Sequence, residues 1–260
     1  MLIKRLYMNN PLRNYSYIIV CEDTQAAAVI DPFDADMILD CAKENGWQIE
    51  KIINTHEHFD HIQGNEAVVK ATQAKIVAHV NAKDSIPNVD HLVTAGDTIQ
   101  VGSSIELTAL DTPGHTFAHL CLFSAQGTPR LFCGDTLFNA GAGNCYTGNA
   151  NALYKTFSEQ LFKLPLNTEV YPGHDYITNN LEFSLDREPD NEFAHQLLQE
   201  VSAQTPQTRM VTTLEIEGKM NAFFRLSNKQ IINKLLESFP DISPSEEQVF
   251  VHLRKLRDKW

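Results

Sequence analysis

The sequence lacks the features that mark several classes of protein. Its 260 residues carry only 21 lysines and arginines against 33 acidic residues, which gives a formal net charge of −12. Nucleic acids and anionic membranes attract summed positive charge, so we expect neither as a partner. No uninterrupted apolar stretch approaches the roughly 18 residues of a membrane span, and Met1–Tyr7 has no secretory apolar core. We therefore expect a soluble chain that is not exported.

Cysteine is also scarce, and its positions exclude two further classes. The cysteines are odd in number and scattered, without the paired spacing of a disulfide framework or a thiolate metal site: Cys21, Cys41, Cys121, Cys133 and Cys145. Reduced thiols in the cytoplasm are the simplest account of this pattern. Proline and glycine are not in excess, so the composition does not indicate disorder.

What the sequence does contain is the pattern of a globular chain with two parts. Hydrophobic residues make up 43% of it, enough for one large domain with an appendage. Strand-like runs alternate with occasional helices up to about residue 175, which predicts two sheets enclosed by helices. From Tyr176 onward the segments are helical and separated by proline-containing turns. We expect domains at 1–175 and 176–260.

The densest chemical signal is a short run of potential metal ligands. A buried strand predicted at Ile49–Asn54 leads directly into Thr55-His56-Glu57-His58-Phe59-Asp60-His61. Loops at the carboxyl ends of strands commonly hold functional groups. Imidazole and carboxylate ligands suit zinc, iron or manganese, and one such loop can supply ligands to two adjacent ions. Three histidines and an aspartate at this spacing are improbable as a merely polar surface loop.

Further ligands are expected downstream, also on loops that follow strands. The candidates are His115 in Thr112-Pro113-Gly114-His115, Asp135 in Gly134-Asp135-Thr136, and His174 in Pro172-Gly173-His174. Taken singly, each of these segments could be an ordinary turn or a helix cap. Their occurrence in this order after the histidine motif favours a shared metal site.

With these motifs the chain resembles the metallo-β-lactamase superfamily, whose Thr-His-x-His-x-Asp-His signature is present in full, and within it the glyoxalase II family of hydroxyacylglutathione hydrolases. The resemblance covers essentially the whole chain. It implies an α+β fold: an αββα sandwich followed by a smaller C-terminal helical domain. It also implies two divalent ions, zinc first and iron or manganese as alternatives, with ligands His56, His58 and His115 for one ion, Asp60, His61 and His174 for the other, and Asp135 shared.

The same resemblance implies the substrate, a small glutathione thioester such as S-lactoylglutathione. A hydroxide that bridges the two ions is expected to attack the thioester carbonyl, with Asp60 and Asp135 acting in catalysis. In the family, two basic residues near the C-terminus bind glutathione and match Arg254 and Arg257. Tyr146, Tyr176 and Asn144 complete the expected substrate site. Two positions depart from the family pattern: Asn144 replaces a basic residue and Arg257 replaces a lysine.

Other functions remain open from the sequence alone. A glutathione-persulfide dioxygenase would use a single iron with two histidines and one aspartate, whereas this chain has the complete second set of ligands. A lactonase of the same superfamily should lack a glutathione pocket. A non-catalytic, metal-stabilised module is also possible, although structural zinc sites usually include cysteine. We expect a monomer or a weak homo-oligomer.

Overall fold

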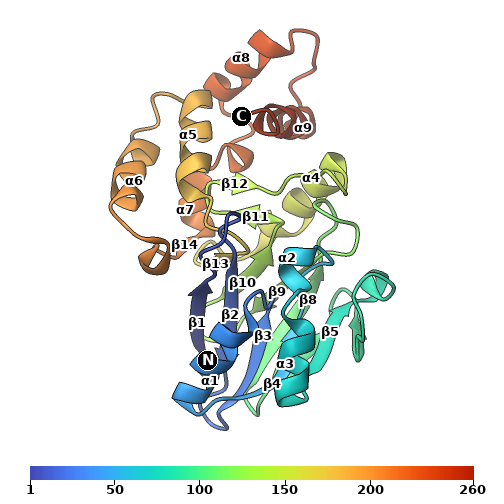
Figure 1. Ribbon diagram of the computed structural model, residues 1–260. Coiled ribbons are helices and arrows are strands. Elements are labelled where there is room, and N and C mark those ends of the chain that lie inside the picture. Colours follow the sequence, from blue (N-terminus) through green and yellow to red (C-terminus); the bar gives the residue numbers. More distant parts are fainter.

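The computed structural model describes residues 1–260 and consists of two six-stranded sheets packed face to face, with helices on the outside (Figure 1). The first sheet has the order β1-β2-β3-β4-β5-β6, formed by Leu2–Tyr7, Tyr15–Val20, Ala26–Ile30, Gln48–Ile53, Lys75–His79 and His91–Val93. The second has the order β14-β13-β10-β9-β8-β7, formed by Thr212–Thr213, Glu169–Pro172, Arg130–Gly134, Leu120–Ser124, Ile105–Asp111 and Thr98–Val101.

Three apolar clusters hold these layers together. One lies between the sheets and includes Tyr17, Leu107 and Phe132. A second packs α1 (Ala35–Asn45) and α3 (Asn65–Thr72) on the outer face of the first sheet. A third packs α4 (Ala150–Glu159) on the second sheet together with C-terminal helices. The predicted αββα sandwich is therefore confirmed.

Helix α1 shows how the local sequence sets its bounds. The side chain of Asp34 accepts a hydrogen bond from the Met37 amide at 3.0 Å and so caps the first turn. Gly46 ends the helix in a left-handed conformation, with φ at 73°, which costs glycine little. Helix α1 therefore begins and ends at residues whose side chain or backbone conformation suits a cap.

The helices that follow β13 gather at one end of the sandwich (Figure 1). They are α5 (Ile177–Arg187), α6 (Glu192–Ser202), α7 (Leu214–Met220), α8 (Lys229–Ser238) and α9 (Glu246–Arg257). This C-terminal part is not wholly helical, because Thr212–Thr213 adds an edge strand to the second sheet by pairing with Glu169–Val170. No helix of the chain has both the length and the apolarity that crossing a membrane requires.

Strand direction explains why the candidate site forms where it does. Strands β3, β4 and β5 run parallel in the first sheet, and β10 and β13 run parallel in the second. Parallel strands end at the same edge, so the segments after β4, β10 and β13 emerge together. Those segments carry the histidine motif, Asp135 and His174. Helix α2 (Phe59–Ile62) begins inside the motif itself.

Candidate metal centre

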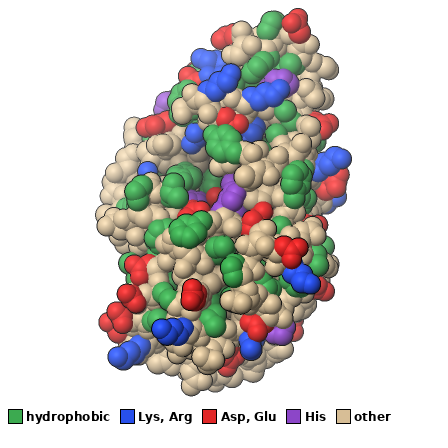
Figure 2. Space-filling model, turned by 45° about the vertical axis from the view of Figure 1, so that its right-hand side comes forward, with side chains coloured by type: hydrophobic (Ala, Val, Ile, Leu, Met, Phe, Trp, Pro, Cys, Tyr) green, Lys and Arg blue, Asp and Glu red, His purple; other side chains and the backbone are tan.

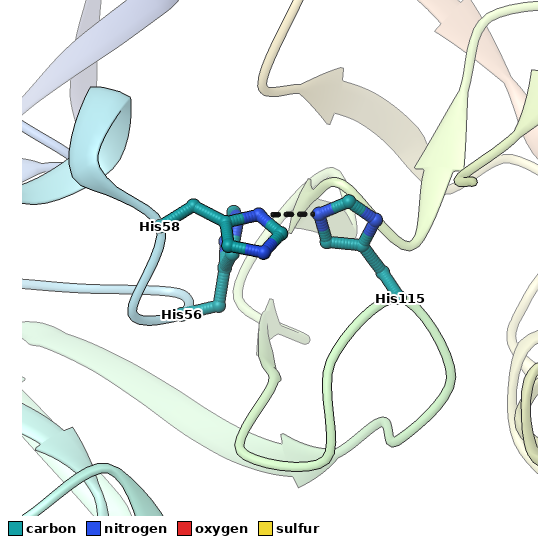
Figure 3. Close-up of side chains that lie close together, drawn as sticks. All are labelled: His56, His58 and His115. Atoms are coloured by element: carbon teal, nitrogen blue, oxygen red, sulfur yellow. Dashed lines mark hydrogen bonds between the residues drawn. The ribbon is translucent and has the colours of Figure 1, made fainter. Parts of the chain in front are cut away.

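The structure brings the predicted metal ligands together in two adjoining groups. In the first, nitrogen atoms of His56, His58 and His115 lie within 4.8 Å of one another. His58 Nδ1 is 3.1 Å from His56 Nε2 and 2.9 Å from His115 Nε2. Figure 3 shows the three rings converging from two loops, one after β4 and one after β8. Three imidazole nitrogens in this arrangement can bind one cation.

The second group consists of Asp60, His61 and His174, whose ligand atoms also lie within 4.8 Å of one another. His61 Nε2 is 3.2 Å from His174 Nε2, and Asp60 Oδ2 is 3.5 Å from His61 Nε2 and 3.6 Å from His174 Nε2. The carboxylate adds negative charge to two imidazoles, which favours a divalent ion.

Asp135 touches both groups. Its Oδ2 is 3.2 Å from His174 Nε2 and 3.5 Å from His115 Nε2, while its Oδ1 is 3.4 Å from His61 Nε2. The Oδ1 atom is buried without a hydrogen-bond partner. Burial acts to raise the pKa of Asp135, but the neighbouring imidazoles of His174 and His61 outweigh it and hold the pKa well below its usual value. A buried, ionised and unpartnered carboxylate oxygen fits a metal ligand.

Two histidines are held by carbonyl groups in the tautomer that a metal requires. Nδ1 of His115 lies 2.7 Å from the carbonyl oxygen of Asn144, and Nδ1 of His174 lies 2.7 Å from that of Leu12. Because a carbonyl oxygen only accepts, each Nδ1 carries the hydrogen and leaves a bare lone pair on Nε2. These lone pairs point into the clusters, and the residues present therefore fit metal ions.

The pKa values of His61 and His56 also indicate that the site can hold a metal ion. Burial acts to lower the pKa of His61, yet Asp135 and Asp31 raise it to about 9. The pocket thus stabilises positive charge at a position where water is excluded. For His56, burial and the neighbouring His61 push the pKa well below its usual value, so this ring stays neutral and able to bind metal.

Sequence reasoning missed three residues that hold the ligands in place. Asp31 accepts hydrogen bonds from the Thr55 amide at 2.7 Å and the Thr55 hydroxyl at 2.6 Å, and it also meets His61 Nδ1 at 2.9 Å. His119 Nε2 accepts from the amide of Asp135 at 3.1 Å. Asn14 donates to Asp60 Oδ2 at 2.9 Å. Asp31 could have been found, because it directly follows the strand Ala26–Ile30, whereas no motif marks the other two.

The backbone comes unusually close to this site at two glycines. Gly134 has a left-handed φ of 44°, and a Cβ there would lie 2.5 Å from Thr55 Oγ1. At Gly173 a Cβ would lie 2.4 Å from Asp135 Oδ1. A side chain at Gly173 would displace Asp135, and one at Gly134 would displace Thr55, which is bonded to Asp31, so glycine is required at both.

Beside the clusters lies a small cavity of about 150 Å³. Its lining includes all five residues predicted to contact the substrate, together with Phe138, Ala142 and Asn180; the five are Asn144, Tyr146, Tyr176, Arg254 and Arg257. Tyr176 stacks on His174 with ring centroids 4.9 Å apart, and Phe138 meets the same imidazole edge-on at 5.7 Å. The cavity therefore adjoins the second ligand group directly.

The two arginines of the cavity differ in their surroundings. Arg254 is only 4% exposed, and its Nη1 donates to the carbonyl oxygens of Ala142 at 2.6 Å and Gly143 at 3.2 Å. Arg257 is half-buried and donates to Asn180 Oδ1 at 3.1 Å. Arg254 therefore fixes the hairpin of β11 (Leu137–Phe138) and β12 (Gly141–Ala142) against α9, a role that the sequence did not predict.

A buried carboxyl group anchors the other side of this hairpin. Glu217 accepts hydrogen bonds from the Ala140 amide at 2.9 Å, the Asn221 amide group at 2.9 Å and the Thr212 hydroxyl at 2.8 Å. Burial is the largest influence and outweighs these donors, so the pKa of Glu217 rises from 4.5 to about 7.

This raised pKa predicts a pH dependence of stability. Between pH 4.5 and about 7 the folded state binds more protons at Glu217 than the unfolded state, so the free energy of unfolding falls as the pH rises. At 1.36 kcal/mol per pKa unit, the contribution is on the order of 3 kcal/mol. Urea unfolding of the wild type and Glu217→Gln at pH 5 and pH 8 should show a larger loss in the wild type than in the variant. An equal loss in both proteins would mean that Glu217 is ionised when folded.

Comparison with known proteins places these features in a family. Residues 9–174 match the Metallo-beta-lactamase superfamily and residues 175–260 match the Hydroxyacylglutathione hydrolase C-terminus. The Hydroxyacylglutathione hydrolases of Nitrosococcus oceani and of a Polaromonas species are 54% and 52% identical to the chain, each over 100% of both sequences. The crystal structure of ETHE1 from Myxococcus xanthus superposes with a TM-score of 0.69 at 28% identity, covering 96% of each chain.

The family matches together span the sandwich that carries the clustered histidines and the helical part that carries the arginine-lined cavity. The full-length relatives share both parts at more than half identity. The chain belongs to the hydroxyacylglutathione hydrolases of the metallo-β-lactamase superfamily.

Proposed function

We propose that this thioester hydrolase cleaves S-(2-hydroxyacyl)glutathione, such as S-lactoylglutathione, to glutathione and a 2-hydroxy acid at a centre of two divalent ions. One ion would be held by His56, His58 and His115, the other by Asp60, His61 and His174, with Asp135 shared. Zinc is the metal we propose first, and iron or manganese suit the same imidazole and carboxylate ligands. The ions supply Lewis acidity and make hydroxide accessible near neutral pH.

The observation that carries the proposal is the direct contact between the arginine-lined cavity and the ligand group. Tyr176 lines the cavity and stacks on His174 at 4.9 Å, so a molecule held in the cavity is one side chain away from the cluster. The carboxylates of glutathione complement the guanidinium groups of Arg254 and Arg257. A lactonase has no need of such a cavity.

The protein's own groups have distinct tasks in this reaction. Asp31 and His119 keep His61 and Asp135 in place through the contacts described above. Asp60 is positioned by Asn14 and can orient the attacking water. The cavity holds the glutathione part and directs the thioester carbonyl toward the clusters, which lowers the entropic cost of reaction.

The proposed function also concerns the domains, the oligomeric state and the compartment of the protein. We propose a catalytic domain at 1–175 and a substrate-binding domain at 176–260, with the active unit a monomer or a weak homo-oligomer. The five unpaired cysteines agree with a reducing cytoplasm, where glutathione thioesters would be met. A small-molecule thioester is the only partner that the proposal requires, without a role for nucleic acid or membrane.

A side-by-side assay tests the reaction type. Purified protein of known metal content should release thiol from S-lactoylglutathione and should consume no oxygen on glutathione persulfide. Oxygen consumption without thiol release would instead identify a persulfide dioxygenase, and turnover of lactones alone would identify a lactonase.

Asn144 gives a prediction about affinity. The backbone carbonyl oxygen of Asn144 accepts a hydrogen bond from His115, and its side chain lines the cavity. This side chain is neutral, whereas the family usually has a basic residue at the position. Asn144→Lys should add a charge-assisted contact to glutathione. Solvent screening should limit the gain to about 1 kcal/mol, roughly fivefold in kcat/KM, mostly through KM.

Kinetics on S-lactoylglutathione at low and high salt check this expectation, because the gain should shrink as salt is raised. An unchanged or lower kcat/KM at low salt would show that Asn144 does not face glutathione, or that the position is suited to another thiol carrier.

A further inference from the structure

Two large aromatic side chains are exposed in segments that are otherwise at least partly buried. Phe59 is 74% exposed between the ligands His58 and Asp60. Phe117 is 57% exposed, although the residues from Gly114 to Thr116 and from Ala118 to Leu120 are all buried. Exposed apolar side chains that lie together form the kind of surface that binds apolar groups.

Both phenylalanines belong to loops that carry ligands of the first group. Phe59 follows His58 directly, and Phe117 lies two residues beyond His115. A hydrogen bond joins the two loops, from the Thr116 hydroxyl to Glu57 Oε2 at 2.9 Å. The two rings are therefore carried by one tied pair of loops. Figure 2 shows hydrophobic side chains gathered around the place where histidine and acidic groups reach the surface.

Neither ring belongs to the glutathione cavity, whose lining comes from the β11–β12 hairpin, the segment after it, α5 and its N-cap Tyr176, and α9. When the thioester carbonyl lies at the clusters, its sulfur points toward the glutathione cavity. The acyl chain, on the other side of the carbonyl carbon, must therefore extend away from that cavity. Phe59 also lines a separate cavity of about 490 Å³, together with residues of α2, α3 and Pro87–Asn88.

Resting on the proposed function, we propose that Phe59 and Phe117 form the acyl-side binding surface. The ligand class is a 2-hydroxyacyl group with an apolar substituent, and an aromatic-sized substituent should be accepted well. A hydroxyl on the carbon next to the carbonyl stays near the polar clusters, while the substituent packs against the rings. The two phenylalanines thus determine acyl specificity, separately from the residues that hold glutathione.

Two glutathione thioesters that differ only in this substituent test the proposal. S-lactoylglutathione carries a methyl group and S-mandeloylglutathione carries a phenyl group. The quantity to follow is the ratio of kcat/KM for the phenyl compound to that for the methyl compound. Loss of one aromatic contact should lower this ratio by about three- to tenfold in Phe59→Ala and in Phe117→Ala, and further in the double variant.

Leu166→Ala is the matched control. Leu166 is also exposed, at 64%, but it precedes β13 and so lies at the opposite edge of the sheet from His174. The control should keep the wild-type ratio. Phe59→Leu, which retains apolar surface, should lose less than Phe59→Ala.

The outcomes separate this inference from the function on which it rests. Thiol release by the wild type with an unchanged ratio in both alanine variants would overturn the acyl surface alone. An equal loss on both thioesters, which also leaves the ratio unchanged, would do the same. No thiol release from either compound by the wild type would overturn the proposed function and this inference together.

Discussion

Asp135→Ala is expected to abolish thioester hydrolysis and to lower the metal content at both sites. The Asp135 carboxylate contacts His115 of the first group and both His61 and His174 of the second, at 3.2–3.5 Å. In the proposed two-ion centre, its removal would take a ligand from each ion and a negative charge from between two cations. Because a metal contributes several kcal/mol to the transition state, we expect a loss in kcat of at least about 10³-fold.

His174→Ala provides the comparison for that variant. His174 belongs to the second group alone through Asp60 and His61, so its loss should deplete mainly one ion per chain. Metal analysis and kinetics on the same samples distinguish the two variants. Two ions per chain and normal turnover in Asp135→Ala would eliminate the shared carboxylate, and equal depletion of both ions in His174→Ala would contradict the division of ligands.

Arg254→Ala is expected to have the largest effect on substrate capture. Arg254 lines the cavity, and its Nη1 holds the carbonyl oxygens of Ala142 and Gly143, so under the proposed function the variant loses a substrate contact and frees the hairpin. A charge-assisted hydrogen bond contributes about 1.5–3 kcal/mol, so kcat/KM should fall about tenfold to a hundredfold. The loss should appear as a rise in KM, because the glutathione carboxylates are remote from the reacting carbonyl.

Two substitutions in the same helix serve as references. Arg257→Ala should also raise KM, but less than Arg254→Ala, because Arg257 is half-buried and holds only Asn180. Lys255→Ala removes the same charge from an exposed position between them and should leave KM near the wild-type value. If both arginine variants behave like the wild type on a glutathione thioester, the two arginines do not bind glutathione and the substrate assignment fails.

The metal ligands could be predicted from the sequence because they occur together in short motifs. The seven expected ligands occur in four such motifs, each at the end of a strand, and the structure brings their side chains into two adjoining groups. Asp31, His119 and Asn14 act from outside those motifs. Their contacts depend on which strands become neighbours in space, and a single sequence does not display that information.

Arg254 shows a second kind of contact that could not be predicted from the sequence. Its charge and its place in the last helix suggested a ligand for glutathione, but not a bond to backbone carbonyls more than a hundred residues away. Similarly, the sandwich was predictable from alternating apolar runs, whereas the edge strand Thr212–Thr213 was not, because two residues carry no periodicity. Short elements of this kind are fixed by the partners they meet in the fold.

A metal titration of chelator-treated protein, followed by thiol release from S-lactoylglutathione, tests directly whether hydrolysis depends on two metal ions. We expect negligible hydrolysis without metal and a rise in activity that reaches its maximum at two zinc, iron or manganese ions per chain. Full activity in metal-free protein, or a maximum at one ion per chain, would contradict a hydrolase built on two adjoining groups of ligands.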